Sequence, residues 1–95
     1  MKRGFVYIMA NKYNTVLYTG VTGDLCGRVH KHKSGEGSGF TIKYKTTKLV
    51  WYDEYPRMRD AIEAEKKIKK WKRKWKIELI EELNPKFEDL YGDIC

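Results

Sequence analysis

Five side chains, spread over the first two thirds of the chain, have the types and order needed to hydrolyse a phosphodiester. Tyr7 and Tyr18 fall in runs typical of β-strands, Arg28 and His32 follow in a run typical of a helix, and Glu65 comes much later. A guanidinium binds phosphate through charge-assisted hydrogen bonds, and phenol or imidazole groups can transfer protons. A carboxylate can hold a divalent metal ion. Together, these phenol, guanidinium and carboxylate groups suit a phosphodiester site with one metal ion.

Two strands must position the tyrosines. Residues 5–10 and 15–21 alternate as strands do, and a short turn separates them. In the resulting antiparallel hairpin we expect Tyr7 and Tyr18 to lie opposite each other. Gly20 would leave a gap in the side-chain layer, where a backbone or a ligand could come close. Each tyrosine alone is also an ordinary strand residue.

A helix of about ten residues, which begins after Asp24, must position the cation and the imidazole. Arg28 and His32 share one face of this helix with apolar residues. We therefore expect Arg28 to point inward, where its charge needs a partner or an anionic ligand. His32 on this face also suits a purely structural role.

The remaining segments predict a loop, a strand and one long helix. Residues 33–46 are rich in glycine and lysine and predict a mobile basic loop, and residues 48–55 predict a third strand. Residues 58–83 have helical periodicity, with Glu65 at the edge of the apolar stripe. The stripe consists of Ala61, Ala64, Ile68, Trp71, Trp75 and Leu79. Asn84 and the proline after it end the pattern. The expected fold is α/β (α+β), a small three-stranded antiparallel sheet flanked by helices.

These residues and their order resemble the GIY-YIG nuclease family, in the small stand-alone form related to the amino-terminal nuclease domain of the repair excinucleases. The two motifs are Phe5-Val6-Tyr7, preceded by Gly4, and Tyr18-Thr19-Gly20. The resemblance covers about residues 4–91 and implies a single domain over residues 1–95. The sequence departs from the family pattern in having Phe5 for glycine, Thr19 for isoleucine and Val21 for the lysine of excinuclease relatives.

The resemblance implies a role for each residue. Tyr7 and Tyr18 would contact the reacting phosphate or help to activate water, and which of them does so stays open. Arg28 would stabilise the phosphate, His32 would act as base or acid or orient a neighbour, and Glu65 would hold one Mg²⁺ or Mn²⁺ ion, weakly without substrate. The accessory positions are Gly20 and Asn84, and Asn84 is equally well explained as a helix stop.

Composition favours a nucleic-acid partner. The chain of 95 residues has a formal net charge of +7 and a pI near 9.4, and counterion release favours binding to a polyanion. The lysines between residues 66 and 76 equally suit a solvated helix face. The lysines predicted to contact nucleic acid are Lys31, Lys33, Lys43, Lys45, Lys69 and Lys70.

The two cysteines, Cys26 and Cys95, lie far apart and show no metal-ligand spacing. We expect free thiols and no structural zinc. The start lacks the apolar segment of a signal peptide, and no apolar run is long enough to span a bilayer. These features predict a soluble cytoplasmic protein with no membrane partner.

The interpretation that accounts for most of these residues is a metal-dependent endonuclease that hydrolyses DNA, structure-selective and active in DNA repair or processing. The sequence does not discriminate DNA from RNA. The alternatives are a non-catalytic nucleic-acid-binding protein on the same scaffold, or a module whose basic helix binds an acidic protein. The chain has no room for a second DNA-binding domain, so specificity would come from a partner protein, from homo-oligomers or from DNA shape.

Overall fold

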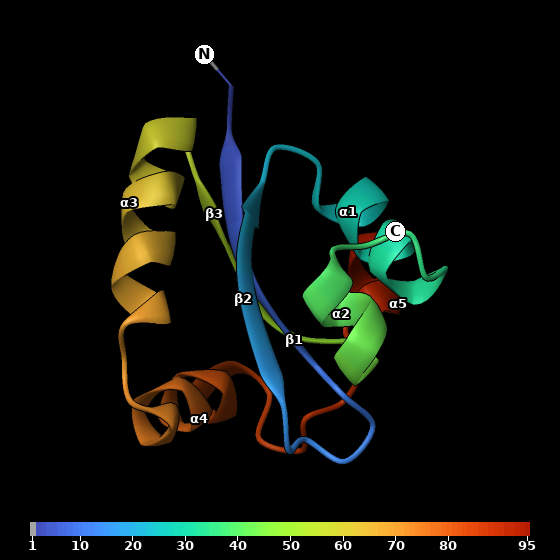
Figure 1. Cartoon of the computed structure of the whole chain (residues 1–95). Helices are drawn as coiled ribbons and strands as arrows, with labels where there is room; N and C mark the ends of the chain where they lie inside the picture. The colour runs from blue at the N-terminus through green and yellow to red at the C-terminus, as the bar shows by residue number, and fades with distance from the viewer. Residues whose placement is uncertain (1) are drawn as a thin grey trace.

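A three-stranded antiparallel sheet forms the centre of the molecule. The computed structural model describes residues 2–95. The strands are β1 (Gly4–Ala10), β2 (Leu17–Thr22) and β3 (Lys48–Tyr55), in the order β2-β1-β3. β1 is antiparallel to both neighbours, which confirms the sheet predicted from the sequence (Figure 1).

The hairpin register differs from the expectation. Tyr7 pairs with Gly20 and Tyr18 pairs with Met9, so the two tyrosines lie diagonally and not opposite each other. The reason is the loop: the side-chain oxygen of Asn11 accepts hydrogen bonds from the backbone N–H groups of Thr15 and Val16. The Asn11 N–H also donates a hydrogen bond to the Val16 carbonyl oxygen (3.2 Å), and the strand pairing runs from Ala10 and Leu17 onward.

Helices cover both faces of the sheet (Figure 1). One face carries α3 (Met58–Lys69) and α4 (Arg73–Leu83), whose residues pack on Val6, Ile8 and Ala10 of β1. The other face carries α1 (Leu25–Lys33), α2 (Gly39–Tyr44) and α5 (Tyr91–Ile94). There Tyr7 and Met9 pack on residues of α1 and β3. The consecutive residues Val6–Ala10 are fully buried because helices lie on both sides of them.

The segment predicted as one helix over residues 58–83 is two helices, because Lys70–Lys72 interrupt it between α3 and α4. A straight helix of that length would measure about 39 Å at ~1.5 Å per residue. The whole molecule extends 36 Å along its longest axis, so the break lets α4 return along the sheet. The turn also takes Trp75 off the predicted stripe and leaves its side chain 51% exposed.

The segment 33–46 is only partly a loop, because α2 forms within it. The side chain of Ser38 caps α2 by accepting a hydrogen bond from the N–H of Thr41. This local capping stabilises a short helix that a glycine- and lysine-rich composition does not indicate.

The prediction of two free thiols is wrong, because Cys26 and Cys95 form a disulfide. Their Cα atoms are 5.5 Å apart although 69 positions separate them in sequence. Packing of the carboxy-terminal segment against α1 brings the two together, and no sequence spacing encodes that packing. In residues 2–95 no helix combines the length and apolarity that crossing a membrane requires.

Candidate active site

Tyr7 lies at the centre of the candidate site, on β1. Its side chain is fully buried, and its phenol lies over Gly20 of the neighbouring strand β2. A Cβ atom at Gly20 would come within 2.5 Å of the phenol oxygen. The gap expected at Gly20 therefore exists, and the phenol of Tyr7 fills it.

His32 contacts this phenol from α1. The Nε2 atom of His32 lies 3.0 Å from the hydroxyl oxygen of Tyr7, and both side chains are buried. Burial, and then the charge of Arg28, lower the pKa of His32, so the ring is neutral at neutral pH. Nδ1 of His32 is also buried and has no hydrogen-bond partner within residues 2–95. In the tautomer that carries its proton on Nδ1, the neutral ring accepts a hydrogen bond from the Tyr7 hydroxyl at Nε2.

The pKa of Tyr7 shows which charges surround it. Burial, followed by the nearby Tyr18, raises this pKa to about 12. The charge of Arg28 opposes the rise, and Glu65 adds to it. Tyr7 is therefore a neutral phenol at physiological pH, and its hydroxyl shares a hydrogen bond with His32.

Arg28 and Tyr18 form the more accessible part of the site. Arg28 is exposed, contrary to the expectation that it points into the core, but its charge still acts on Tyr7 and His32. No carboxylate within the described residues pairs with its guanidinium. The half-buried ring of Tyr18 lies 5.5 Å from the ring of His32, centroid to centroid. A phosphate approaching from solvent would meet Arg28 before the buried groups.

Glu65 lies on α3, which packs on the opposite face of the sheet, and its charge acts on Tyr7. Its residue is only 9% exposed, and its carboxylate lies 3.5 Å from the ammonium of Lys69, one turn later. Within residues 2–95 no three His, Cys, Asp or Glu side chains cluster as metal ligands. This donor set fits Mg²⁺, which keeps water ligands and takes oxygens from a substrate, and does not fit a structural zinc ion.

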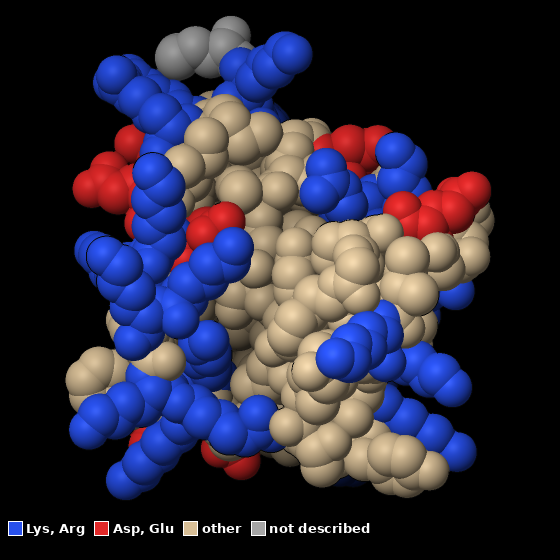
Figure 2. Space-filling view, viewed as in Figure 1, with Lys and Arg blue, Asp and Glu red and all other residues tan. Residues whose placement is uncertain are grey.

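The six lysines predicted to contact nucleic acid fall into two groups, those paired with a carboxylate and those exposed to solvent. Lys33 forms an ion pair with Asp89, and Lys69 pairs with Glu65, so both have partners within the protein. The others are exposed and accessible to phosphate: Lys31, Lys43, Lys45 and Lys70. Figure 2 shows one face, with Lys and Arg gathered over α3 and α4, mostly uncharged surface over β2, and a smaller group of cationic side chains over α2.

Asn84 has a structural position and is buried. Its amide nitrogen donates hydrogen bonds to the carbonyl oxygens of Val50 (3.1 Å) and Glu88 (2.7 Å), and its amide oxygen accepts one from the Glu88 N–H. Asn84 also caps α4. These bonds account for the whole side chain and favour the helix-stop interpretation.

The sequence interpretation missed aromatic residues beside the site. Phe40 and Tyr44 lie on α2, and the ring centroid of Phe40 is 5.6 Å from that of Tyr18. Their spacing of four residues was the available signal, because it places both rings on one side of a helix. The glycine- and lysine-rich composition of residues 33–46 predicts a loop, in which this spacing has no meaning.

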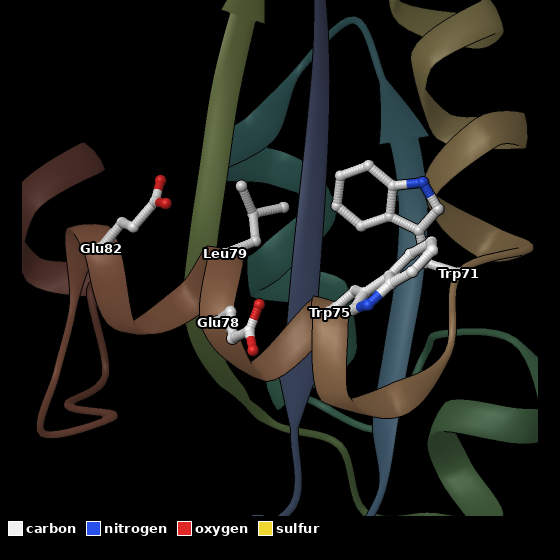
Figure 3. Close-up of a pocket in the computed structure, with 5 residues that line it drawn as sticks. All are labelled: Trp71, Trp75, Glu78, Leu79 and Glu82. Carbon is white, nitrogen blue, oxygen red and sulfur yellow. The ribbon is translucent and has the colours of Figure 1, made fainter.

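A hollow on α4 does not belong to the site. It has a volume of about 340 Å³ and contains none of the predicted catalytic residues (Figure 3). Its lining is Trp71, Trp75, Glu78, Leu79 and Glu82. The two carboxylates would repel a phosphate, so this hollow is no candidate for phosphodiester chemistry.

Comparisons with known proteins identify a family, two sequence relatives and a similar solved structure. A family model described as the GIY-YIG catalytic domain matches residues 3–78. A UPF0213 protein of Staphylococcus epidermidis is 34% identical over 82 residues, which are 86% of this chain and 99% of that protein. A UPF0213 protein of Staphylococcus aureus is 35% identical over 82 residues, again 86% of this chain and 99% of that protein. The solution structure of a UPF0213 protein from Bacillus halodurans has a TM-score of 0.58 and 30% identity, covering 92% of both chains.

Proposed function

The chain belongs to the GIY-YIG catalytic domain family, and from that premise we propose that it is an endonuclease that hydrolyses DNA phosphodiester bonds with one divalent metal ion. The observation that carries the proposal is the buried hydrogen bond between Tyr7 and His32, within reach of the charges of Arg28 and Glu65. We further propose that it acts in DNA repair or processing, on DNA of a particular structure.

The proposed reaction is one in-line displacement. A water oxygen forms a bond to phosphorus while the bond from phosphorus to the leaving oxygen breaks, and the leaving oxygen takes a proton from solvent. Tyr7 is buried in the free protein, so substrate binding must first open its hydroxyl to the attacking water. That water then passes a proton to the hydroxyl oxygen of Tyr7 as Tyr7 gives its own proton to Nε2 of His32. His32 is thus the final proton acceptor, which suits its neutral ring. Arg28 binds the non-bridging oxygens, where negative charge accumulates.

Glu65 is the residue that would hold the metal ion. A bound Mg²⁺ or Mn²⁺ ion would supply neutralising charge near the leaving oxygen. Lys69 competes for the same carboxylate, so we expect weak metal binding until the phosphate of a substrate contributes further oxygens.

The matched variants Glu65→Gln and Glu63→Gln test the proposal. Both lie on α3 and change the net charge equally, but Glu63 is exposed. We expect Glu65→Gln to reduce cleavage to the level seen with EDTA and Glu63→Gln to cleave as the wild type does. Arg28→Lys keeps the charge but loses the planar fork, so we expect cleavage to fall about 100-fold.

The measurement is cleavage of end-labelled single-stranded, duplex, nicked, flapped and branched DNA, and of matched RNA, with Mg²⁺, Mn²⁺ or EDTA. Circular dichroism verifies that each variant is folded. Cleavage that persists in EDTA or in Glu65→Gln would refute the metal-dependent reaction. Binding without cleavage under every condition would favour the alternative, a nucleic-acid-binding protein that keeps the scaffold. The ion pair between Glu65 and Lys69 favours this alternative, because it engages the carboxylate that would hold the metal ion.

A further inference from the structure

A row of aromatic rings leads from the candidate site to the surface. The ring of Tyr7 is followed by Tyr18 at 6.3 Å, then Phe40 at 5.6 Å and Tyr44 at 4.7 Å, all between centroids. The first ring is fully buried, whereas Phe40 and Tyr44 are 41% and 40% exposed. The row therefore connects the centre of the site with solvent along α2.

A pocket lies at the outer end of this row. It has a volume of about 410 Å³ and lies between the β1–β2 loop and the end of α2. Its lining is Asn11, Lys12, Tyr13, Tyr44, Lys45 and Thr47. Among the described residues, the lining thus has two tyrosines, two lysines and no acidic residue. The volume falls in the range of pockets that hold small ligands.

Tyr13 and Tyr44 are both exposed aromatic residues. Tyr13 is 74% exposed, nearly twice as much as Tyr44. The ammonium of Lys12 lies 5.6 Å from the ring centroid of Tyr13, and that of Lys43 lies 5.3 Å from that of Tyr44. Exposed rings flanked by cations suit a ligand that carries both aromatic groups and anions, because the rings stack on bases and the ammonium groups neutralise phosphates.

We infer that the pocket between Tyr13 and Tyr44 binds an unpaired base of the substrate strand, and that Phe40 contacts the strand between this base and the scissile phosphate. The inference rests on the proposed function for its link to cleavage. In a duplex both faces of each base are already stacked, so a paired base would have to leave the helix to enter the pocket. The substrate class is therefore DNA with unpaired nucleotides next to the cleaved bond.

Binding in EDTA tests this inference without cleavage. Fluorescence anisotropy compares a single-stranded oligonucleotide with a blunt duplex of the same length, for wild type, Tyr44→Ala and Tyr44→Phe. We expect Tyr44→Ala to lose about tenfold in affinity for the single strand and little for the duplex. Tyr44→Phe keeps the ring and should bind as the wild type does. Trp75→Ala, which removes a comparably exposed ring on α4, is the matched control.

An abasic scan then locates the bound base. Oligonucleotides that lack one base at successive positions should bind the wild type about tenfold more weakly at one position. Tyr44→Ala should show no further loss at that position, because the stacking partner is already missing. Equal affinity for single strand and duplex, or an equal loss in Trp75→Ala, would overturn the inference.

The two proposals fail separately. A protein that shows this binding pattern and cuts nothing would refute the nuclease and keep the base pocket. A protein that cuts duplex DNA with metal and loses nothing in Tyr44→Ala would refute the pocket and keep the nuclease.

Discussion

Gly20 and Tyr7 show how a single residue sets the chemistry of this site. The phenol of Tyr7 reaches His32 only because position 20 lacks a side chain. A glycine inside a strand normally weakens it, since it packs nothing and costs conformational entropy. Here the loss is offset by the space that it gives to a buried, hydrogen-bonded phenol.

We therefore predict that Gly20→Ala lowers the cleavage rate about 100-fold, because the new methyl group displaces the phenol by around an ångström. Gly92→Ala is the control, since no described atom lies within 4 Å of its added Cβ. Rates under single-turnover conditions measure the effect, and urea unfolding verifies stability. A Gly20→Ala protein that cleaves at the wild-type rate would show that Tyr7 needs no fixed position.

His32 gives the site a pH dependence. Its pKa is lowered on folding, so the stabilisation from its neutral form is fully present above the unfolded value of about 6.5. That stabilisation is lost as pH falls below 6.5 through the folded pKa. We predict that wild type loses stability between pH 7 and pH 5 more steeply than His32→Gln does, as measured by urea unfolding. Cleavage by wild type should fall over the same range, because protonated His32 accepts no proton. Parallel stability profiles for the two proteins would contradict this.

The residue types of the site could be predicted from sequence, and their contacts could not. Tyr7, Tyr18, Arg28, His32 and Glu65 were singled out as candidates by type and order, and their roles in a reaction stay predictions. That Tyr7 and not Tyr18 bonds His32 depends on a register set by the side chain of Asn11. A difference of two positions in hairpin pairing exchanges diagonal and facing partners, and composition does not encode it.

At the scale of elements, the strands were predictable and the later helices were less so. Alternation marks a strand over a few residues, whereas the end of α3 has neither glycine nor proline to mark it. The break follows from the size of the molecule, which no local window contains. The aromatic pocket was missed for a related reason, because it joins the β1–β2 loop to α2, far apart in sequence.

The disulfide joins two elements, since Cys26 lies on α1 and Cys95 follows α5. Closing a loop with a sequence separation of 69 stabilises the folded state by up to about 4 kcal/mol, by restricting the unfolded chain. We predict that reductant lowers the free energy of unfolding of wild type by about 2–4 kcal/mol. The double variant Cys26→Ser, Cys95→Ser should not respond to reductant. If the free energy of unfolding of wild type is the same with and without reductant, the two thiols are free and form no disulfide.

For the whole molecule, the architecture follows from the apolar side chains that β1 presents to both faces of the sheet. β1 is buried on both sides, so its run Val6–Ala10 is apolar throughout, and the tyrosine is the only polar-tipped side chain in it. Helices on both faces then leave the edge at β2 as the place where residues of α1, α2 and α3 meet. The family fold and the sheet were accessible from sequence because each depends on many residues at once.

The central place of β1 has a consequence for synthesis on the ribosome. β1 is made before all of its neighbours, yet Ile80 is among the residues that cover Val6 and Ile8. At roughly 5–20 residues per second, the hairpin waits for about 3–12 s before that cover exists. During this interval a nascent chain displays an apolar strand with an open edge, which favours association with other chains or with a chaperone. The strand that carries Tyr7 is thus the earliest to appear and among the last to be protected.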